Sequence, residues 1–156
     1  MSTNVKIDPK EVQRLRAETN AGVMDCKRAL EDAQGDFEKA KGLLKQRGLA
    51  SVKNKSGREA KEGTVASYIH ANGRVGAIVE IASETDFVAR SEEFQKLAQE
   101  VAMQIAAMEP ADMDALLRQA YIRDGSKTIN DLVTTLAASV GENVSVRRFQ
   151  RFAVGE

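Results

Sequence analysis

The sequence contains few of the residues on which metal, redox and disulfide chemistry depends. Its 156 residues include one cysteine, one histidine and no tryptophan, and aromatic residues make up only 4% of the chain. The single cysteine, Cys26, excludes an internal disulfide and suits a reducing compartment. One cysteine and one histidine cannot supply the ligands of a usual structural zinc site. We therefore expect no metal site and no cofactor.

Catalytic motifs are also missing from the sequence. The segment between Gly57 and Gly63 does not have the order of a phosphate-binding loop, G-x-x-x-x-G-K-[ST]. His70, the only histidine, has no nucleophile or acid at a suitable spacing. Cys26 lies in a helical pattern with no activating histidine in its block. The sequence therefore predicts a protein that is not an enzyme.

Neither an excess of charge nor a long apolar run is present. Lys and Arg number 23, as do Asp and Glu, so the net charge gives no general attraction to nucleic acid or to a membrane. Residues 1–4 begin no apolar signal segment, and no apolar run approaches membrane-spanning length. We expect a soluble, cytoplasmic protein of one or two small domains.

Three short helices are expected in residues 1–50, forming an N-terminal domain. Asp8 and Pro9 have the pattern of an N-cap followed by proline at the first helical position. A second helix is expected over 23–33, and a third from Asp36, with Gly48 as its end. Three helices of this length make a very small bundle, which is only marginally stable alone.

Residues 51–62 are expected to be a linker. Lys53, Lys55, Arg58 and Lys61 make this stretch basic, and apolar periodicity disappears from it. It could be an RNA-binding arm or a solvated connector between two domains. We favour the connector, because no aromatic side chain accompanies the charges.

Residues 63–156 have the pattern of a sheet packed with helices. Asn72 and Gly73 suit the positive φ angles of a tight hairpin turn. The expected strands are 64–70, 74–82 and 144–153, and the expected amphipathic helices are 91–108 and 128–140. The last strand should pair antiparallel with the hairpin, since its own local partner is a helix. The expected fold class is α+β, with a three-stranded antiparallel sheet.

The stretch 83–90 joins the second expected strand to the helix that follows, and Asp86 and Phe87 are adjacent in it. One interpretation is local: Asp86 caps the helix and Phe87 is a core residue that closes the corner. The other is functional: an acid and a large aromatic side chain lie side by side on a short, rigid connection between a strand and a helix, where function often lies in α/β chains.

Three blocks of sequence carry a family resemblance. Residues 85–89 read T-D-F-V-A, residues 19–30 read T-N-A-G-V-M-D-C-K-R-A-L, and residues 141–149 read G-E-N-V-S-V-R-R-F. In this order they resemble the signature, the N-terminal block and the C-terminal block of the elongation factor Ts family. Asn20 stands where glycine is usual in that family, and asparagine is the other residue that best tolerates positive φ.

The resemblance implies a guanine-nucleotide exchange factor that promotes GDP release from elongation factor Tu. It implies that Thr85, Asp86, Phe87 and Val88 form the loop that displaces Mg²⁺ and nucleotide. In this mechanism Phe87 enters an apolar slot between two helices of the partner's nucleotide domain, and the shift is passed on to the metal site.

The resemblance also implies that the N-terminal domain is UBA-like, similar to the compact three-helix domains that bind ubiquitin. Arg16, Val23 and Met24 would then lie against a helix of the nucleotide-binding domain of elongation factor Tu. Each of these three residues could instead pack within its own domain.

Two other functions stay open. After Pro110 the chain is shorter than relatives usually are, so it could bind elongation factor Tu without driving exchange; the intact Asp86-Phe87 pair argues against this. It could also be an RNA-binding domain that uses the linker and Arg147, Arg148 and Arg151. Neutral net charge argues against RNA, as does the strand period, which separates Arg148 from the other two.

The face of the expected sheet that helices leave uncovered is not cleanly polar. We expect this face to carry Ala66, Tyr68, Gly76, Ile78 and either Phe149 or Phe152. A three-stranded sheet with an apolar outer face is an unfinished structure. Longer relatives cover it with a second, similar subdomain, and this chain has one copy. We therefore expect a homodimer with the two sheets face to face, bound to two copies of elongation factor Tu.

Overall fold

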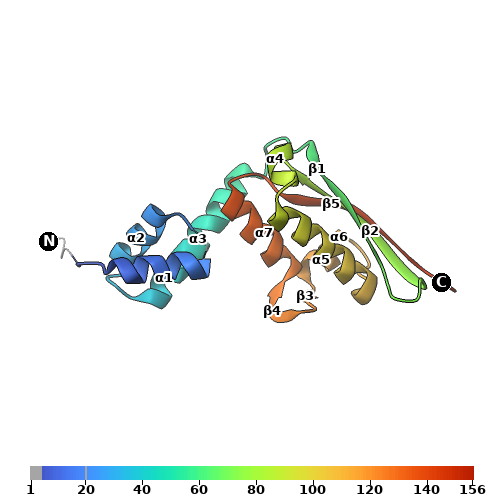
Figure 1. Cartoon of the computed structure of the whole chain (residues 1–156), viewed down its shortest axis with the longest axis horizontal. Helices are drawn as coiled ribbons and strands as arrows, with labels where there is room; N and C mark the ends of the chain where they lie inside the picture. Colours follow the sequence, from blue (N-terminus) through green and yellow to red (C-terminus); the bar gives the residue numbers. More distant parts are fainter. Residues whose placement is uncertain (1–4, 20) are drawn as a thin grey trace. The chain divides into compact units, whose positions relative to one another are not determined.

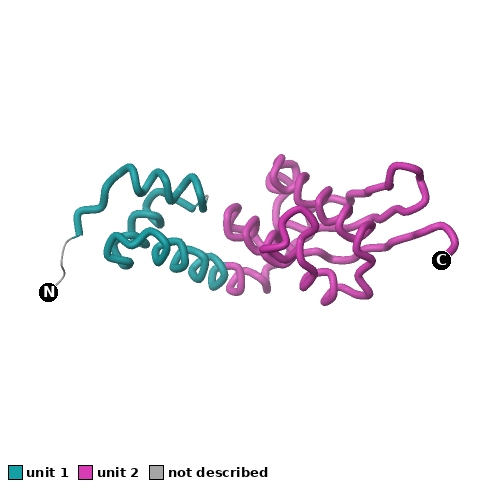
Figure 2. Tube along the Cα trace, turned by 90° about the horizontal axis from the view of Figure 1, so that it is seen from below, with its two compact units in different colours: residues 1–51 teal, residues 52–156 magenta. Residues whose placement is uncertain are grey.

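The computed structural model describes residues 5–19 and 21–156. Asn20, whose backbone conformation is discussed above, lies outside the described residues. The chain divides into two compact units, residues 1–51 and 52–156, which Figure 2 draws in different colours. No helix among the described residues is long and apolar enough to span a membrane.

The first unit is built on three helices, α1 (Pro9–Thr19), α2 (Val23–Asp32) and α3 (Phe37–Lys55). Leu15 of α1 and Cys26 of α2 are fully buried among the apolar residues of this unit. The Asp8 carboxylate accepts a hydrogen bond from the backbone N–H of Lys10 (2.9 Å), as expected of a residue before the first turn. The three predicted helices are confirmed.

The end of α3 differs from the prediction. Gly48 does not stop the helix, which continues to Lys55 and so includes the first residues of the expected linker 51–62. Val52 packs against the core of the second unit, and glycine costs only about 1 kcal/mol in a helix interior. The apolar contact at Val52 can offset that cost, and β1 then begins at Glu62.

The second unit contains the predicted three-stranded antiparallel sheet (Figure 1). Its strands are β1 (Glu62–Ile69), β2 (Val75–Ser83) and β5 (Ser145–Ala153), in the order β1-β2-β5. At the hairpin turn Gly73 has φ of 73°, and its N–H donates to the His70 carbonyl at 2.7 Å. The Asn72-Gly73 turn and the antiparallel pairing of the last strand are thus confirmed.

Helix α5 (Glu92–Met108) packs on one face of the sheet, and α7 (Ile129–Val140) packs against α5. The Ser91 hydroxyl accepts the Phe94 N–H at 3.3 Å and begins α5, as predicted. At the start of α7, Thr128 and Asp131 form a reciprocal capping box. Phe94 and Ile105 of α5 are fully buried against the sheet.

The segment between α5 and α7 contains elements that the sequence pattern does not predict: α6 (Met113–Arg118), β3 (Ala120–Tyr121) and β4 (Asp124–Thr128). The fully buried Gln104 of α5 fixes this segment. Its amide nitrogen donates to the Ala120 carbonyl at 3.0 Å, and its amide oxygen accepts the Ile122 N–H at 3.0 Å. These bonds satisfy a buried amide that would otherwise be costly.

The outer face of the sheet is apolar at the hairpin end and polar towards the other end, and some of its residues differ from those predicted. Ala66 and Phe149 both pair with the buried Val79, and Tyr68 pairs with the buried Ala77, so these three residues face the helices. Residues directly opposite in a ladder share a face. The outer face carries the predicted Gly76, Ile78 and Phe152, together with Val65, Ser67 and Ile69, and it also carries the polar residues Glu80, Arg148 and Gln150.

Candidate functional site

A single helical turn, α4 (Asp86–Ala89), joins β2 to α5. Thr85 is its N-cap, with an extended backbone (φ −120°, ψ 153°) and a hydroxyl that accepts the Val88 N–H at 3.3 Å. Asp86 is therefore the first helical residue, and the interpretation of Asp86 as the cap is wrong. Its acidic side chain still lies in the first turn, where a helix favours negative charge.

The turn places Phe87 outward and its neighbours inward. Val88 and Ala89 are buried in the core beneath α4, whereas Phe87 is 84% exposed. The interpretation of Phe87 as a core residue is therefore wrong. Val88, which the sequence places among the partner contacts, lies in the core, so we assign it an anchoring role. Its burial leaves the ring of Phe87 as the large apolar group that this loop presents to solvent.

Hydrogen bonds from both sides hold this turn. The Ser83 hydroxyl donates to the Thr85 carbonyl at 2.9 Å. The Ser91 hydroxyl donates to the Val88 carbonyl at 2.7 Å, and the Gln95 amide donates to the Ala89 carbonyl at 2.6 Å. The last two bonds satisfy carbonyls at the end of α4. The backbone that carries Phe87 is therefore held in one conformation.

Asp86 lies next to Phe87 and is accessible. Its carboxylate is 3.4 Å from the Arg90 guanidinium, and the two side chains are 61% and 82% exposed. An exposed ion pair of this kind contributes little stability. Asp86 can therefore leave this ion pair and contact another protein at a low cost in free energy.

A further carboxylate, from a residue far along the chain, holds the start of the same loop. Glu142 Oε1 accepts the backbone N–H groups of Glu84 (3.1 Å) and Thr85 (3.0 Å), and Glu142 Oε2 accepts the Thr85 hydroxyl at 2.7 Å. Sequence reasoning did not assign a role to Glu142. The available signal was its place in the 141–149 block that carries the family resemblance.

The candidate residues of the first unit lie on its surface. Val23 and Met24 begin α2 and are 47% and 58% exposed, and Arg16 is exposed in the last turn of α1. The alternative in which these side chains pack within their own domain is therefore not favoured. Cys26, two residues beyond Met24, is buried, and burial raises the pKa of its thiol. A raised pKa disfavours the reactive thiolate.

The arginines of β5 are engaged within the second unit. Arg147 donates to the Ala60 carbonyl at 2.8 Å, Arg148 lies 3.3 Å from the Glu80 carboxylate, and Arg151 donates to the Ala106 carbonyl at 3.1 Å. A surface that binds phosphates would keep such groups free and together.

Among residues 5–19 and 21–156, no three His, Cys, Asp or Glu side chains are grouped to hold a metal ion.

Comparison with known proteins gives consistent matches. The model of the family described as Elongation factor TS matches residues 84–156. Elongation factor Ts of Anaeromyxobacter sp. (strain K) is 41% identical over 196 aligned positions, which cover 97% of this chain and 90% of that protein. Chloroplastic elongation factor Ts of Guillardia theta is 40% identical over 198 positions, with the same coverage of both chains. Elongation factor Ts of Carboxydothermus hydrogenoformans is 40% identical over 195 positions, covering 96% and 90%. Each alignment is longer than the 156 residues of this chain, so these relatives carry residues that it lacks.

Proposed function

Because the chain belongs to the elongation factor Ts family and so to the factors of translation elongation, we propose that it promotes the release of GDP from elongation factor Tu. The observation that carries this proposal is the exposure of Phe87 on a hydrogen-bonded corner of the second unit. The lone cysteine suits the cytoplasm, where we place this activity.

Exchange of this kind requires no catalytic group in the factor. A GTPase holds its nucleotide and Mg²⁺ through a phosphate loop and switch segments, so moving those elements releases the nucleotide. A factor that binds the nucleotide-free form more tightly must weaken nucleotide binding by the same ratio. In this proposal the protein acts by binding to its partner, and it makes or breaks no covalent bond.

Phe87 supplies the displacing group in this proposal. Its ring enters an apolar slot between two helices of the partner's nucleotide domain and shifts them, which disturbs the Mg²⁺ site. Asp86, accessible beside the ring, makes a polar contact that fixes the approach. Thr85 holds the turn as its cap, and Val88 anchors it to the core.

The direct test is the rate of GDP release. Elongation factor Tu loaded with a fluorescent GDP is mixed with excess unlabelled GDP in a stopped-flow instrument, with and without this protein. We expect release to accelerate with increasing concentration of the protein and to reach a plateau. Binding without acceleration would favour a pure binding module, and binding to RNA that weakens with salt would favour the RNA alternative.

We expect Asp86→Ala to reduce exchange less than the loss of the Phe87 ring would. The substitution removes one polar contact, worth about 1–3 kcal/mol when the partner group is left buried and unpaired. Release rates at a series of concentrations measure this loss. Arg90→Ala is the matched control, because it breaks the same 3.4 Å ion pair and leaves the carboxylate in place. An equal loss in both variants would assign the effect to the ion pair and contradict a partner contact by Asp86.

The first unit supplies a second contact with the partner. Arg16, Val23 and Met24 are all exposed at the end of α1 and the start of α2. Two exposed apolar side chains and a cation in one small unit suit the surface of a partner helix, where apolar burial gives affinity and the charge gives orientation. In this proposal the first unit increases affinity, and the Phe87 loop produces the exchange.

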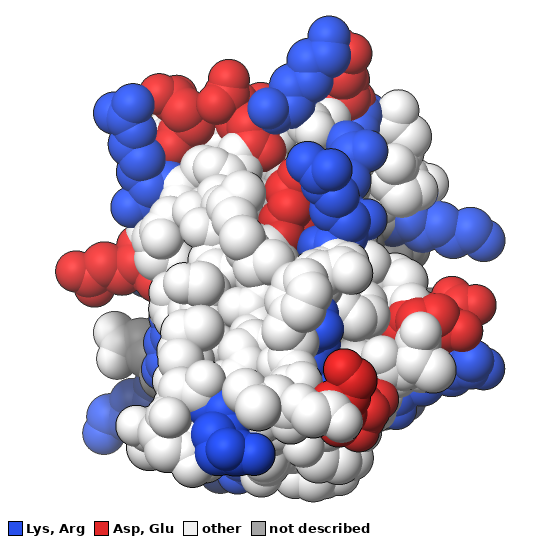
Figure 3. Space-filling model, turned by 90° about the vertical axis from the view of Figure 1, so that its right-hand side faces the viewer, with Lys and Arg blue, Asp and Glu red and all other residues white. Residues whose placement is uncertain are grey.

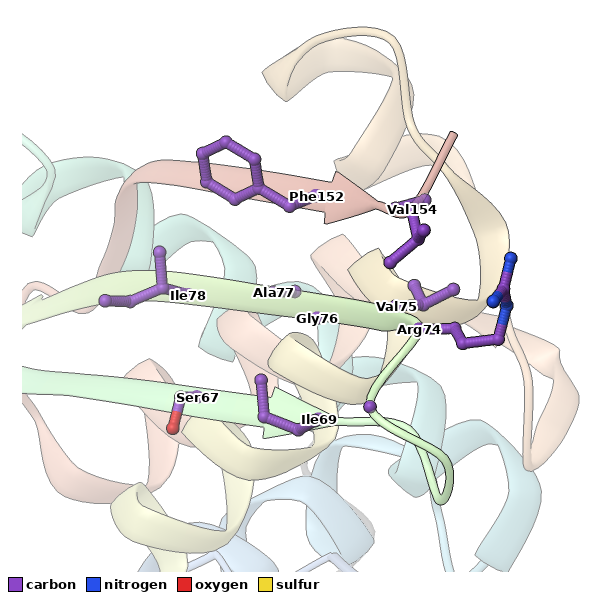
Figure 4. Close-up of a pocket in the computed structure, with 11 residues that line it drawn as sticks. Ser67, Ile69, Arg74, Val75, Gly76, Ala77, Ile78, Phe152 and Val154 are labelled. Atoms are coloured by element: carbon purple, nitrogen blue, oxygen red, sulfur yellow. The ribbon is translucent and has the colours of Figure 1, made fainter. Parts of the chain in front are cut away.

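A homodimer is also part of the proposal. Ile69 and Phe152 lie on opposite sides of Gly76 on the outer sheet face and are 64% and 71% exposed (Figure 4). A shallow groove of about 420 Å³ lies between them and includes Ile78 and Val154. Figure 3 views this end of the second unit, where charged side chains gather mainly around the rim.

Gly76 lets the Ile69 side chain lie close over β2. A Cβ at residue 76 would come within 2.6 Å of the Ile69 Cδ1 atom, the flexible end of that side chain. An exposed ring and a hollow on one face make a self-complementary surface. A two-fold axis would bring the Phe152 ring of each copy to the groove of the other. Two such copies could hold two molecules of elongation factor Tu.

Phe152→Asp should therefore convert the dimer to a monomer, because the new carboxylate would be buried without a partner. Sedimentation equilibrium at micromolar concentration should give twice 17.0 kDa for the parent and 17.0 kDa for the variant. Ile122→Asp is the control, since it adds the same charge at an exposed apolar residue of the β3–β4 turn. A parent protein of 17.0 kDa at every concentration would rule out the dimer.

A further inference from the structure

Glu142 makes an unusual set of hydrogen bonds for a residue that follows a helix end. Its carboxylate accepts two backbone N–H groups and one hydroxyl, all from Glu84 and Thr85, at 2.7 to 3.1 Å. The partners are 57 and 58 residues away in sequence. Hydrogen bonds to an ionised acceptor are roughly twice as strong as neutral ones. These three therefore fix the backbone and side chain of Thr85, the residue that caps α4.

The Thr85 hydroxyl links this carboxylate to the turn itself. Its proton points to Glu142 Oε2, because a carboxylate can only accept. Its lone pair is then directed to the Val88 N–H, the bond that caps α4. Glu142 thus sets the orientation of the capping hydroxyl, and the cap sets the direction in which the next residues, Asp86 and Phe87, leave the sheet.

Neighbouring residues extend this contact into a network. The Asn143 N–H donates to the Glu84 carboxylate at 2.7 Å, and the Asn143 amide donates to the Arg58 carbonyl at 2.8 Å. The Arg58 guanidinium lies 3.7 Å from the Glu84 carboxylate. The network therefore joins the loop before α4, the segment after α7 and the segment before β1, all within the second unit. These bonds lie beside the contact of Glu142 with Thr85 and hold the same loop in place.

We infer that Glu142 is a positioning residue for nucleotide exchange: through Thr85 it holds α4 so that Phe87 meets the partner in one orientation. The inference rests on the proposed function, because it assigns Glu142 an effect that passes through the Phe87 ring. Glu142 itself need not touch the partner. A side chain that is 84% exposed has few contacts of its own to fix its direction, so its base must be fixed instead.

A double-mutant cycle on the full-length protein tests this route. GDP release from elongation factor Tu is measured at saturating concentrations of the parent, Glu142→Ala, Phe87→Ala and the double variant. We expect Glu142→Ala to lower the maximal rate about tenfold, which is within the coupling typical of interacting residues. In the Phe87→Ala background the same substitution should have almost no further effect, because the group it positions is already gone.

Glu142→Gln is the conservative variant. Its amide oxygen can accept the two backbone N–H groups, but its amide nitrogen would donate to the Thr85 hydroxyl and no longer accept its proton, so exchange should recover in part. Asp131→Ala is the matched control, since Asp131 also accepts a backbone N–H at a helix start, 2.9 Å from the nitrogen of Thr128. It should lower the melting temperature and leave the maximal exchange rate unchanged.

Amide hydrogen exchange gives a readout that does not need the partner. In Glu142→Ala the Glu84 and Thr85 amides should exchange faster, while amides in the middle of α5 keep their protection. Equal losses of rate with and without the Phe87 ring would overturn the inference, as would a Glu142→Gln variant as poor as Glu142→Ala. A Phe87→Ala variant with the parent's activity would instead overturn the proposed function on which the inference rests.

Discussion

Phe87→Ala is expected to lose most of the acceleration of GDP release while the protein folds as before. The ring is 84% exposed in the free protein, so its removal takes away few internal contacts. In the complex the ring becomes buried, and truncating a buried phenylalanine typically costs about 3–5 kcal/mol. That free energy corresponds to a change of roughly 100-fold to several thousand-fold in the affinity to which it is coupled.

The measurement is the concentration dependence of GDP release, with the melting temperature recorded for each variant. Phe87→Leu should retain part of the effect, because leucine keeps an apolar group of smaller volume at the same position. Ile122→Ala, which shortens an exposed apolar side chain on the β3–β4 turn, should behave as the parent. If Phe87→Ala melts at the parent's temperature and releases GDP at the parent's rate, the displacement mechanism is wrong.

Replacing both Val23 and Met24 with aspartate is expected to weaken binding to elongation factor Tu by more than tenfold. Burying a valine or methionine side chain is worth about 1.5–3 kcal/mol, and each new carboxylate would face an apolar surface. Both side chains are about half exposed in the free protein, so the first unit should still fold.

Calorimetric titration of nucleotide-free elongation factor Tu measures the affinity of this variant. Leu49→Asp is the control, because Leu49 is an exposed apolar residue of the same unit, on α3. At saturating concentration the Val23 and Met24 variant should still accelerate GDP release, since the Phe87 loop is intact. An affinity equal to the parent's would contradict a contact of Val23 and Met24 with the partner.

Local signals in the sequence predicted much of the second unit correctly. The Asn72-Gly73 turn, the Ser91 cap of α5 and the Thr128–Asp131 capping box each depend on residues a few positions apart. The antiparallel pairing of β5 with the hairpin was predicted because the element next to β5 in the sequence is a helix and not a strand. Such short-range rules need no knowledge of the rest of the fold.

The direction of Phe87 could not be predicted in the same way. The cap is Thr85 and not Asp86, and the Phe87 ring faces solvent. The capping hydroxyl of Thr85 is also bonded to Glu142, which is 57 residues away in sequence. The β3–β4 hairpin depends in a similar way on the buried Gln104, a polar residue inside an otherwise apolar helix stripe. Long-range polar contacts of this kind leave no periodic trace in the sequence.

The anchored β3–β4 hairpin has a consequence for how the family can vary in length. Ala120 pairs with Thr128 and Tyr121 with Asp124, so the chain leaves and returns at neighbouring points, and only Ile122 and Arg123 form the tip. Gln104 holds Ala120 at the base of this hairpin, and Ile122 at the start of its tip, to α5. Extra residues spliced at the tip would leave α6 and α7 in place, and each doubling of a flexible insertion adds only about 0.6 kcal/mol of loop-closure cost. The hairpin is thus a point where evolution can lengthen or shorten the protein without rebuilding its core.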